Sequence, residues 1–74
     1  MNKPVIDMVL TGQNISTLRK QSGYSVRDLA DLLDMPAVNP VYKWEKGMTL
    51  PSIDNLVLLA SVLNTTLDNI IITR

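Results

Sequence analysis

The sequence of 74 residues contains no cysteine, no histidine and no phenylalanine. Without cysteine, neither a disulfide bond nor a cysteine-based zinc site can hold the fold together. Without histidine, the chain lacks the commonest general base and the commonest metal ligand. The fold must therefore rest on the packing of aliphatic side chains, and 46% of the residues are apolar.

Catalytic motifs are missing as well. The sequence has no glycine-rich phosphate loop, and its serine, threonine and lysine residues have no evident general base to activate them. Asp28 and Asp31 are three residues apart and could imitate a pair of metal ligands. No third oxygen ligand lies near them, so capping and solvation explain them better. We expect no enzyme, no metal site and no cofactor.

Long hydrophobic runs are also absent. No apolar stretch approaches the roughly 18 residues that a membrane-spanning helix needs. The opening Met-Asn-Lys-Pro lacks the apolar region and cleavage site of a signal peptide. These observations predict a cytoplasmic protein that makes no contact with a membrane.

The formal net charge is zero, because seven basic residues balance seven acidic ones. A domain that binds nucleic acid more often carries a basic excess. Several basic residues lie in the central part of the chain, at Arg19, Lys20, Arg27, Lys43 and Lys46. A local basic surface is compatible with a neutral chain.

Capping residues and the helical spacing of apolar side chains predict an all-α fold of five helices. Residues that favour a helix start are Thr11, Ser25, Asn39 followed by Pro40, Ser52 and Thr66. Residues that stop the first four helices are Gly23, Pro36, Gly47 and Asn64. The first helix is expected over residues 12–22. Residues 1–10 are interpreted as an N-terminal arm or an extra turn, and residues 11–74 as the domain.

Four polar residues share one face of the expected third helix, at positions i, i+3, i+4 and i+7: Asn39, Tyr42, Lys43 and Lys46. Asparagine can pair with adenine and lysine with guanine in the major groove of DNA. The alternative is an ordinary solvated face on which Asn39 serves only as a cap. Trp44 lies three residues after Val41 and is expected in the core.

Other residues are weaker candidates for contacts with DNA. Val38 could touch a thymine methyl group or simply be an apolar residue of the turn. Arg19, Lys20 and Arg27 could bind phosphates. Arg19 and Lys20 also lie at the end of the first expected helix, where positive charge favours the helix dipole in any case.

Seven short motifs follow one another along the chain between Thr11 and Ile71. They are Thr11-Gly12, Leu18-Arg19-Lys20, Gly23-Tyr24-Ser25, Asp28-Leu29-Ala30, Tyr42-Lys43-Trp44-Glu45-Lys46-Gly47, Leu50-Pro51 and Leu67-Asp68. With these motifs the chain resembles the lambda-repressor/Cro-like helix-turn-helix family, also called the xenobiotic-response-element type. The resemblance implies a compact five-helix DNA-binding domain in which the second and third helices form the helix-turn-helix. The third helix would then enter the major groove.

The resemblance also implies a role for particular residues. The positions that match the family's base-reading sites are Val38, Asn39, Tyr42 and Lys43, and those that match its phosphate contacts are Val26 or Arg27, and Lys46. The chain departs from the family where Pro36, Ala37 and Val38 replace the usual polar start of the recognition helix. The turn before that helix is expected to be one residue longer than the common form.

Five apolar residues remain for a dimer interface: Leu58, Val62, Ile70, Ile71 and Ile72. The alternative is that the last helix packs on the fourth and covers them.

Taken together, these features predict a sequence-specific DNA-binding transcription regulator that binds double-stranded DNA as a homodimer. A second hypothesis is a protein-interaction module, such as an antitoxin, anti-repressor or adaptor, with little affinity for DNA.

Overall fold

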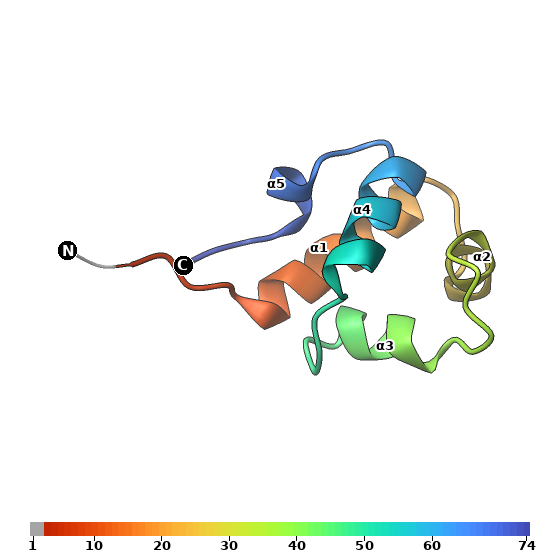
Figure 1. Cartoon of the computed structure of the whole chain (residues 1–74), viewed down its shortest axis with the longest axis horizontal. Coiled ribbons are helices and arrows are strands. Elements are labelled where there is room, and N and C mark those ends of the chain that lie inside the picture. Colours follow the sequence, from red (N-terminus) through yellow and green to blue (C-terminus); the bar gives the residue numbers. More distant parts are fainter. Residues whose placement is uncertain (1–2) are drawn as a thin grey trace.

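The computed structural model describes residues 3–74, and most of them lie in five α-helices (Figure 1). The helices are α1 (Met8–Gln21), α2 (Val26–Leu32), α3 (Asn39–Glu45), α4 (Ile53–Val62) and α5 (Leu67–Ile70). This architecture confirms the predicted all-α fold. No helix in residues 3–74 is long and apolar enough to cross a membrane.

Three of the predicted helix starts are confirmed. The hydroxyl groups of Ser25, Ser52 and Thr66 each accept a hydrogen bond from the backbone N–H three residues later. At α2 the bond is reciprocal, because the Asp28 carboxylate accepts from the Ser25 N–H at 2.9 Å and completes a capping box. Each of these caps satisfies backbone groups that the first turn of a helix leaves unpaired.

The start of the first helix was predicted wrongly. It begins at Met8, where Asp7 is the N-cap and accepts a hydrogen bond from the Leu10 N–H at 2.9 Å. Thr11 is instead fully buried inside α1, and its hydroxyl accepts from the Ile72 N–H at 2.9 Å. The threonine therefore ties α1 to the end of the chain, and α1 runs without a break through residues 8–11.

The third helix also starts differently from the prediction. Asn39 is its first helical residue, while Val38 is the N-cap and makes no side-chain capping bond. Pro40 lies in the first turn, where its missing N–H is not needed. The side chain of Asn39 is consequently not used as a cap.

The four longer helices end in the same way, with a residue in the left-handed conformation: Gly23, Asp34, Gly47 and Asn64. In each case the next residue donates its N–H to the carbonyl five positions earlier, as in Met48 to Lys43 at 2.9 Å. These are Schellman motifs. Asp34 was not predicted: it follows Leu33, the C-cap of α2, so the helix ends before Pro36, which had been expected to stop it.

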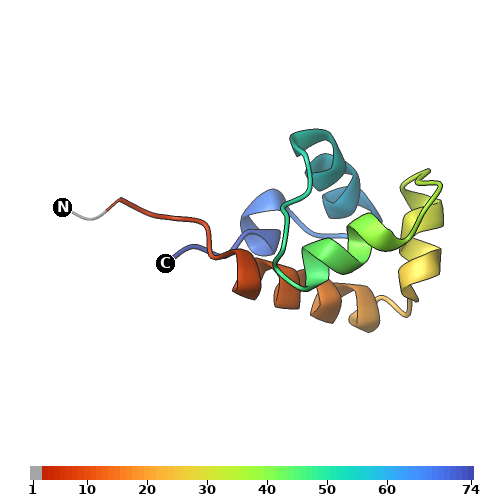
Figure 2. The ribbon, with the colours of Figure 1, turned by 90° about the horizontal axis from the view of Figure 1, so that it is seen from below.

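One hydrophobic core joins all five helices. Its fully buried side chains include Ile15, Leu29, Val41, Leu59 and Ile70. Trp44 is only 4% exposed, which confirms its predicted place in the core. Ile70 is 0% exposed, so its predicted part in a dimer surface is wrong: α5 is packed with this side chain inward. The two views of the ribbon show α3 lying along α1 (Figures 1 and 2).

The first described residues and the last residues of the chain lie side by side and project from the helices (Figures 1 and 2). Residues 3–7 run antiparallel to residues 71–74; we call this pair the terminal ribbon. The Val5 N–H donates to the Arg74 carbonyl at 3.1 Å, and the Arg74 N–H donates to the Val5 carbonyl at 2.8 Å. A third bond joins the Asp7 N–H to the Ile72 carbonyl at 2.8 Å. Ile6 and Thr73 face each other between these bonds.

Candidate nucleic-acid interface

The outward face of α3 gathers four of the residues predicted to bind DNA. Asn39, Tyr42, Lys43 and Lys46 are all exposed, while Val41 and Trp44 on the opposite side of the helix are buried. The four side chains line one shallow hollow of about 290 Å³ together with Met48. The helical spacing therefore places them on a single surface, as the sequence indicated.

Asn39 is available to this surface because Val38, and not Asn39, caps the helix. Its amide has one donor end and one acceptor end, which suits the edge of an adenine base. Val38 itself is half-buried and packs against the hydrophobic core. Its place in the structure favours the interpretation as an apolar turn residue.

Met48 was missed by the sequence interpretation. It follows Gly47, whose φ of 74° turns the chain back over the end of α3. Met48 is 62% exposed and borders the same hollow as Tyr42 and Lys46. The signal for it was the glycine stop, which fixes where the next side chain points.

Arg27 and Lys20 lie outside this hollow. Arg27 is in the first turn of α2, largely exposed, and its guanidinium is 3.7 Å from the Asp31 carboxylate one helical turn later. An exposed pair of this kind contributes little to stability and leaves Arg27 able to exchange partners. Lys20 is exposed in the last turn of α1.

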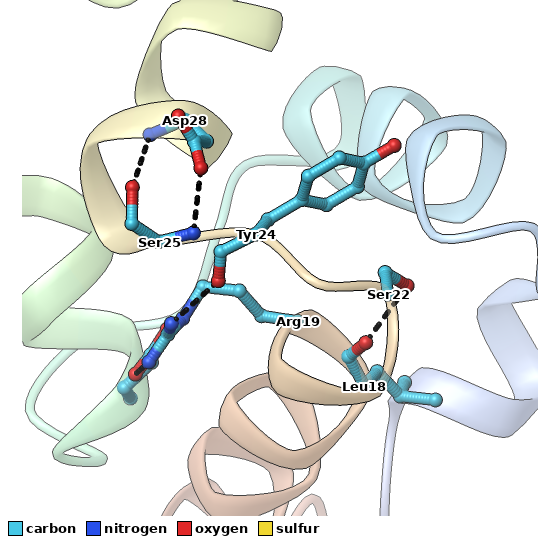
Figure 3. A network of polar contacts seen from close by, with 7 residues as sticks. Leu18, Arg19, Ser22, Tyr24, Ser25 and Asp28 are labelled. Carbon is cyan, nitrogen blue, oxygen red and sulfur yellow. Dashed lines mark hydrogen bonds and ion pairs between the residues drawn. The ribbon is translucent and has the colours of Figure 1, made fainter.

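Arg19 is not a phosphate ligand, contrary to the sequence hypothesis that included it. It is buried, and its guanidinium binds the Glu45 carboxylate through two hydrogen bonds of 2.7 and 3.0 Å. A third bond of 2.8 Å runs from the same guanidinium to the Tyr24 carbonyl, in the loop before α2 (Figure 3). The bonds to Glu45 raise the pKa of Arg19 further above neutrality, so the charge is permanent.

This buried ion pair holds three elements of the site together. Arg19 comes from α1, Tyr24 from the loop that leads into α2, and Glu45 from the last turn of α3. A bidentate contact fixes the relative orientation of its two partners as well as their distance. The helix that carries the exposed residues is therefore anchored at its C-terminal end.

Gly12 allows α1 and α3 to approach this closely. A Cβ atom at position 12 would lie 2.2 Å from the Trp44 carbonyl oxygen and 2.8 Å from the Glu45 carbonyl oxygen. Both distances are shorter than any van der Waals contact. Glycine is disfavoured inside a helix, so its presence in α1 reflects the packing of α3.

The charges of the site are divided between its two sides. On the inner side, Glu45 neutralises Arg19. On the outer side, neither Lys43 nor Lys46 forms an ion pair with any residue in the range 3–74. Two positive charges therefore face solvent on α3, although the chain as a whole has no net charge.

Comparisons with known proteins agree with this geometry. The sequence profile described as helix-turn-helix matches residues 15–70. The restriction-modification controller protein C.AhdI from Aeromonas hydrophila is similar in structure, with a TM-score of 0.78 and 30% identity over 86% of this chain and 96% of that chain. The clp gene regulator ClgR from C. glutamicum has a TM-score of 0.76 at 17% identity, over 85% and 80% of the two chains. No match was found among curated protein sequences.

Proposed function

Because this chain belongs to the lambda-repressor-like helix-turn-helix family of DNA-binding transcription regulators, we propose that it recognises a specific operator by inserting α3 into the major groove. The observation that carries the proposal is the exposed face of α3, where an amide, a phenol and two unpaired ammonium groups line one hollow. The opposite face of the same helix is locked to α1.

The residues of this face divide into two roles. Asn39, Tyr42 and Lys43 lie at the first two turns of α3 and contact base edges, with Lys43 donating to guanine. Lys46 lies at the end of the helix and binds phosphate. Arg27, in the first turn of α2, binds phosphate after releasing Asp31. Val38 is at most a contact for a thymine methyl group.

A single copy offers too few base contacts to select one site in a genome. Two good contacts contribute roughly 1–3 kcal/mol each to discrimination, and twofold symmetry doubles that contribution. We therefore propose a dimer with half-sites about 34 Å apart. Exposed Leu58, together with half-buried Val62, Ile71 and Ile72, supplies the remaining apolar surface for such an interface.

C.AhdI is the more similar of the two structures, and it is a restriction-modification controller protein. By analogy, we propose that this chain is also a controller of transcription. Its operator has two symmetric half-sites.

A selection from random DNA duplexes tests the proposal. The expected product is an inverted repeat whose half-sites are separated by one helical turn. Binding to this product should weaken steeply as salt increases, with a slope of about −0.9 for each phosphate contact. Failure to enrich any sequence, together with no retention on random duplex DNA at low salt, would contradict it.

The alternative, a protein-interaction module, predicts that no DNA sequence is enriched and that the protein is not retained on random duplex DNA at low salt. It draws on the zero net charge and on the apolar residues Val26, Ala37 and Val38, of which Val26 is buried in the core. The two unpaired lysines on α3 favour the DNA-binding function over this alternative.

A further inference from the structure

The terminal ribbon has two open edges. In an antiparallel pair, the residues that lie between the hydrogen-bonded positions direct their backbone groups away from the partner strand. Ile6 and Thr73 occupy these positions, and their N–H and C=O groups make no hydrogen bond within residues 3–74. Open strand edges of this kind are templates for pairing with another chain.

The two edges differ in the side chains beside them. Val5, Ile6, Val9 and Leu10 are all exposed, by 54%, 39%, 53% and 46% respectively. Together with Asp7, Met8 and Arg74 they line a hollow of about 730 Å³. The edge at Thr73 has no exposed large apolar side chain of its own. The edge of residues 4–7 is therefore the one that loses most exposed apolar surface if it is covered.

We infer that the edge of residues 4–7 pairs with the same edge of a second copy of this chain. The two edges run antiparallel about a twofold axis, with Ile6 opposite Ile6 of the other copy. The two ribbons then form one four-stranded antiparallel sheet. Each Ile6 donates its N–H to the other Ile6 carbonyl, so backbone groups that are unpaired in one copy become satisfied.

The side chains are complementary in this register. Asp7 of each copy lies opposite Val5 of the other, and Val5 is paired on its far side with Arg74. Asp7 of one copy and Arg74 of the other are thus on the same face of the sheet, at two symmetric positions. They are two strands, or roughly 10 Å, apart with Val5 between them, so their opposite charges attract weakly without forming a direct ion pair. The zero net charge of the chain also removes general repulsion between copies.

The pairing does not involve the surface proposed to bind DNA. The terminal ribbon projects from the helical body, and none of its residues lines the hollow on α3 (Figures 1 and 2). A test without DNA can therefore fail while the proposed function stands, and the reverse is equally true. Ile71 and Ile72, which the dimer proposed for DNA binding uses, lie on the other strand of the ribbon and Leu58 lies on α4, so the edge of residues 4–7 is separate from that interface.

Disulfide formation gives a direct test, because the chain has no cysteine. Two residues directly opposite in an antiparallel pair have Cα atoms about 5.5 Å apart, within the range of a disulfide. Ile6→Cys should form an intermolecular disulfide, and Thr73→Cys, on the other edge, is the matched control. Pairing should make the Ile6→Cys reaction at least about tenfold faster, since it raises the effective thiol concentration. Equal rates for the two variants would overturn the inference.

Proline gives a second test that does not depend on thiol chemistry. Among the backbone groups, Ile6→Pro removes only an outward N–H and retains the three bonds of the ribbon, and Thr73→Pro does the same on the other edge. In sedimentation experiments Ile6→Pro should weaken self-association about tenfold, because both symmetric hydrogen bonds are lost. Thr73→Pro should associate like the wild type, and both should keep the wild-type circular dichroism spectrum. A larger effect from Thr73→Pro, or a wild-type protein that does not self-associate, would refute the pairing.

Discussion

The two faces of α3 differ in burial, in the pairing of their charges and in the closeness of their packing. The inner face is closed: Trp44 is 4% exposed, Glu45 binds Arg19 through two hydrogen bonds, and Gly12 leaves no space for a methyl group. The outer face is open, and its lysines have no carboxylate partner in the described chain. One helix of seven residues therefore carries both the anchor and the proposed reading surface.

This difference explains how so short a helix can serve recognition. A helix of two turns is not stable alone, so its geometry must come from tertiary contacts. The contacts with α1 provide this geometry, so the side chains of the outer face are not needed to hold the helix in place. Substitutions on the inner face should therefore change stability first, and substitutions on the outer face should change only binding. Substitutions on the two faces therefore test this division.

The largest effect is expected from Gly12→Ala. Helix propensity alone would make this change stabilising by about 1 kcal/mol. The added methyl would instead meet the Trp44 carbonyl oxygen at 2.2 Å, so α3 must move away from α1. We expect a loss of about 4 kcal/mol or more in the free energy of unfolding, measured by urea denaturation.

Gly23→Ala is the matched control for that change. A Cβ at position 23 would meet no atom within 4 Å, and the only cost is the φ of 80°. This cost should be about 1–2 kcal/mol. If Gly12→Ala were no more harmful than Gly23→Ala, the close packing of α1 and α3 would not hold in solution.

A slightly smaller loss is expected from Arg19→Met. It leaves the Glu45 carboxylate, whose side chain is only 11% exposed, without its partner, at a cost of about 3 kcal/mol. Glu45→Met should have a similar cost, because it leaves the guanidinium unpaired. Replacing both residues removes both buried charges, so the double variant should be more stable than either single variant. Thermal unfolding of the four proteins makes a double-mutant cycle, and additive losses would argue against a coupled pair.

On the outer face, Lys43→Ala and Lys46→Ala should leave stability within about 0.5 kcal/mol of the wild type. Lys43→Ala should relax the preference for one base pair of the selected operator, by about 1–3 kcal/mol. Lys46→Ala should weaken binding to all sequences and lower the salt slope by about one. Lys3→Ala, which removes the same charge from the terminal ribbon, is the control and should bind normally. Wild-type binding by both α3 variants would show that the wrong face had been assigned.

Local sequence signals were sufficient for much of this structure. Ser25, Ser52 and Thr66 cap helices through bonds to residues three positions away, and such pairs are visible in the sequence. Gly47 and Asn64 adopt the left-handed conformation for which these residue types are suited. The helical spacing of apolar residues likewise predicted the burial of Trp44. The caps and helix ends depend on interactions within a few residues, and the burial of Trp44 is visible in the apolar spacing of one helix.

The errors arose where a residue has a distant partner. Thr11 looked like a cap, but its hydroxyl is used by Ile72, which is 61 residues away. Arg19 was a weak candidate for a phosphate contact and was also explained by the helix dipole, but neither interpretation contained Glu45, which lies 26 residues further along the chain and binds it. The terminal ribbon joins Val5 to Arg74, at opposite ends of the sequence. No local pattern contains such partners, so only the folded arrangement reveals them.

The smallest effect should come from the capping box of α2, which is local and exposed to solvent. The bonds from the backbone and side chain of Ser25 lower the pKa of Asp28, so the folded state favours its charged form. Its contribution to stability is therefore present above the pKa that Asp28 has in the unfolded chain, and is lost as the pH falls through the lowered value. Asp28→Asn should be slightly less stable than the wild type near neutral pH, and the difference should shrink between about pH 5 and 2. Urea denaturation across this range measures the difference, and one that stays constant with pH would mean that the carboxylate charge has no part in the cap. Because no atom of α1 or α3 takes part in these bonds, the effect on DNA binding should be smaller than for Arg19→Met, which separates a local contact from one that positions α3.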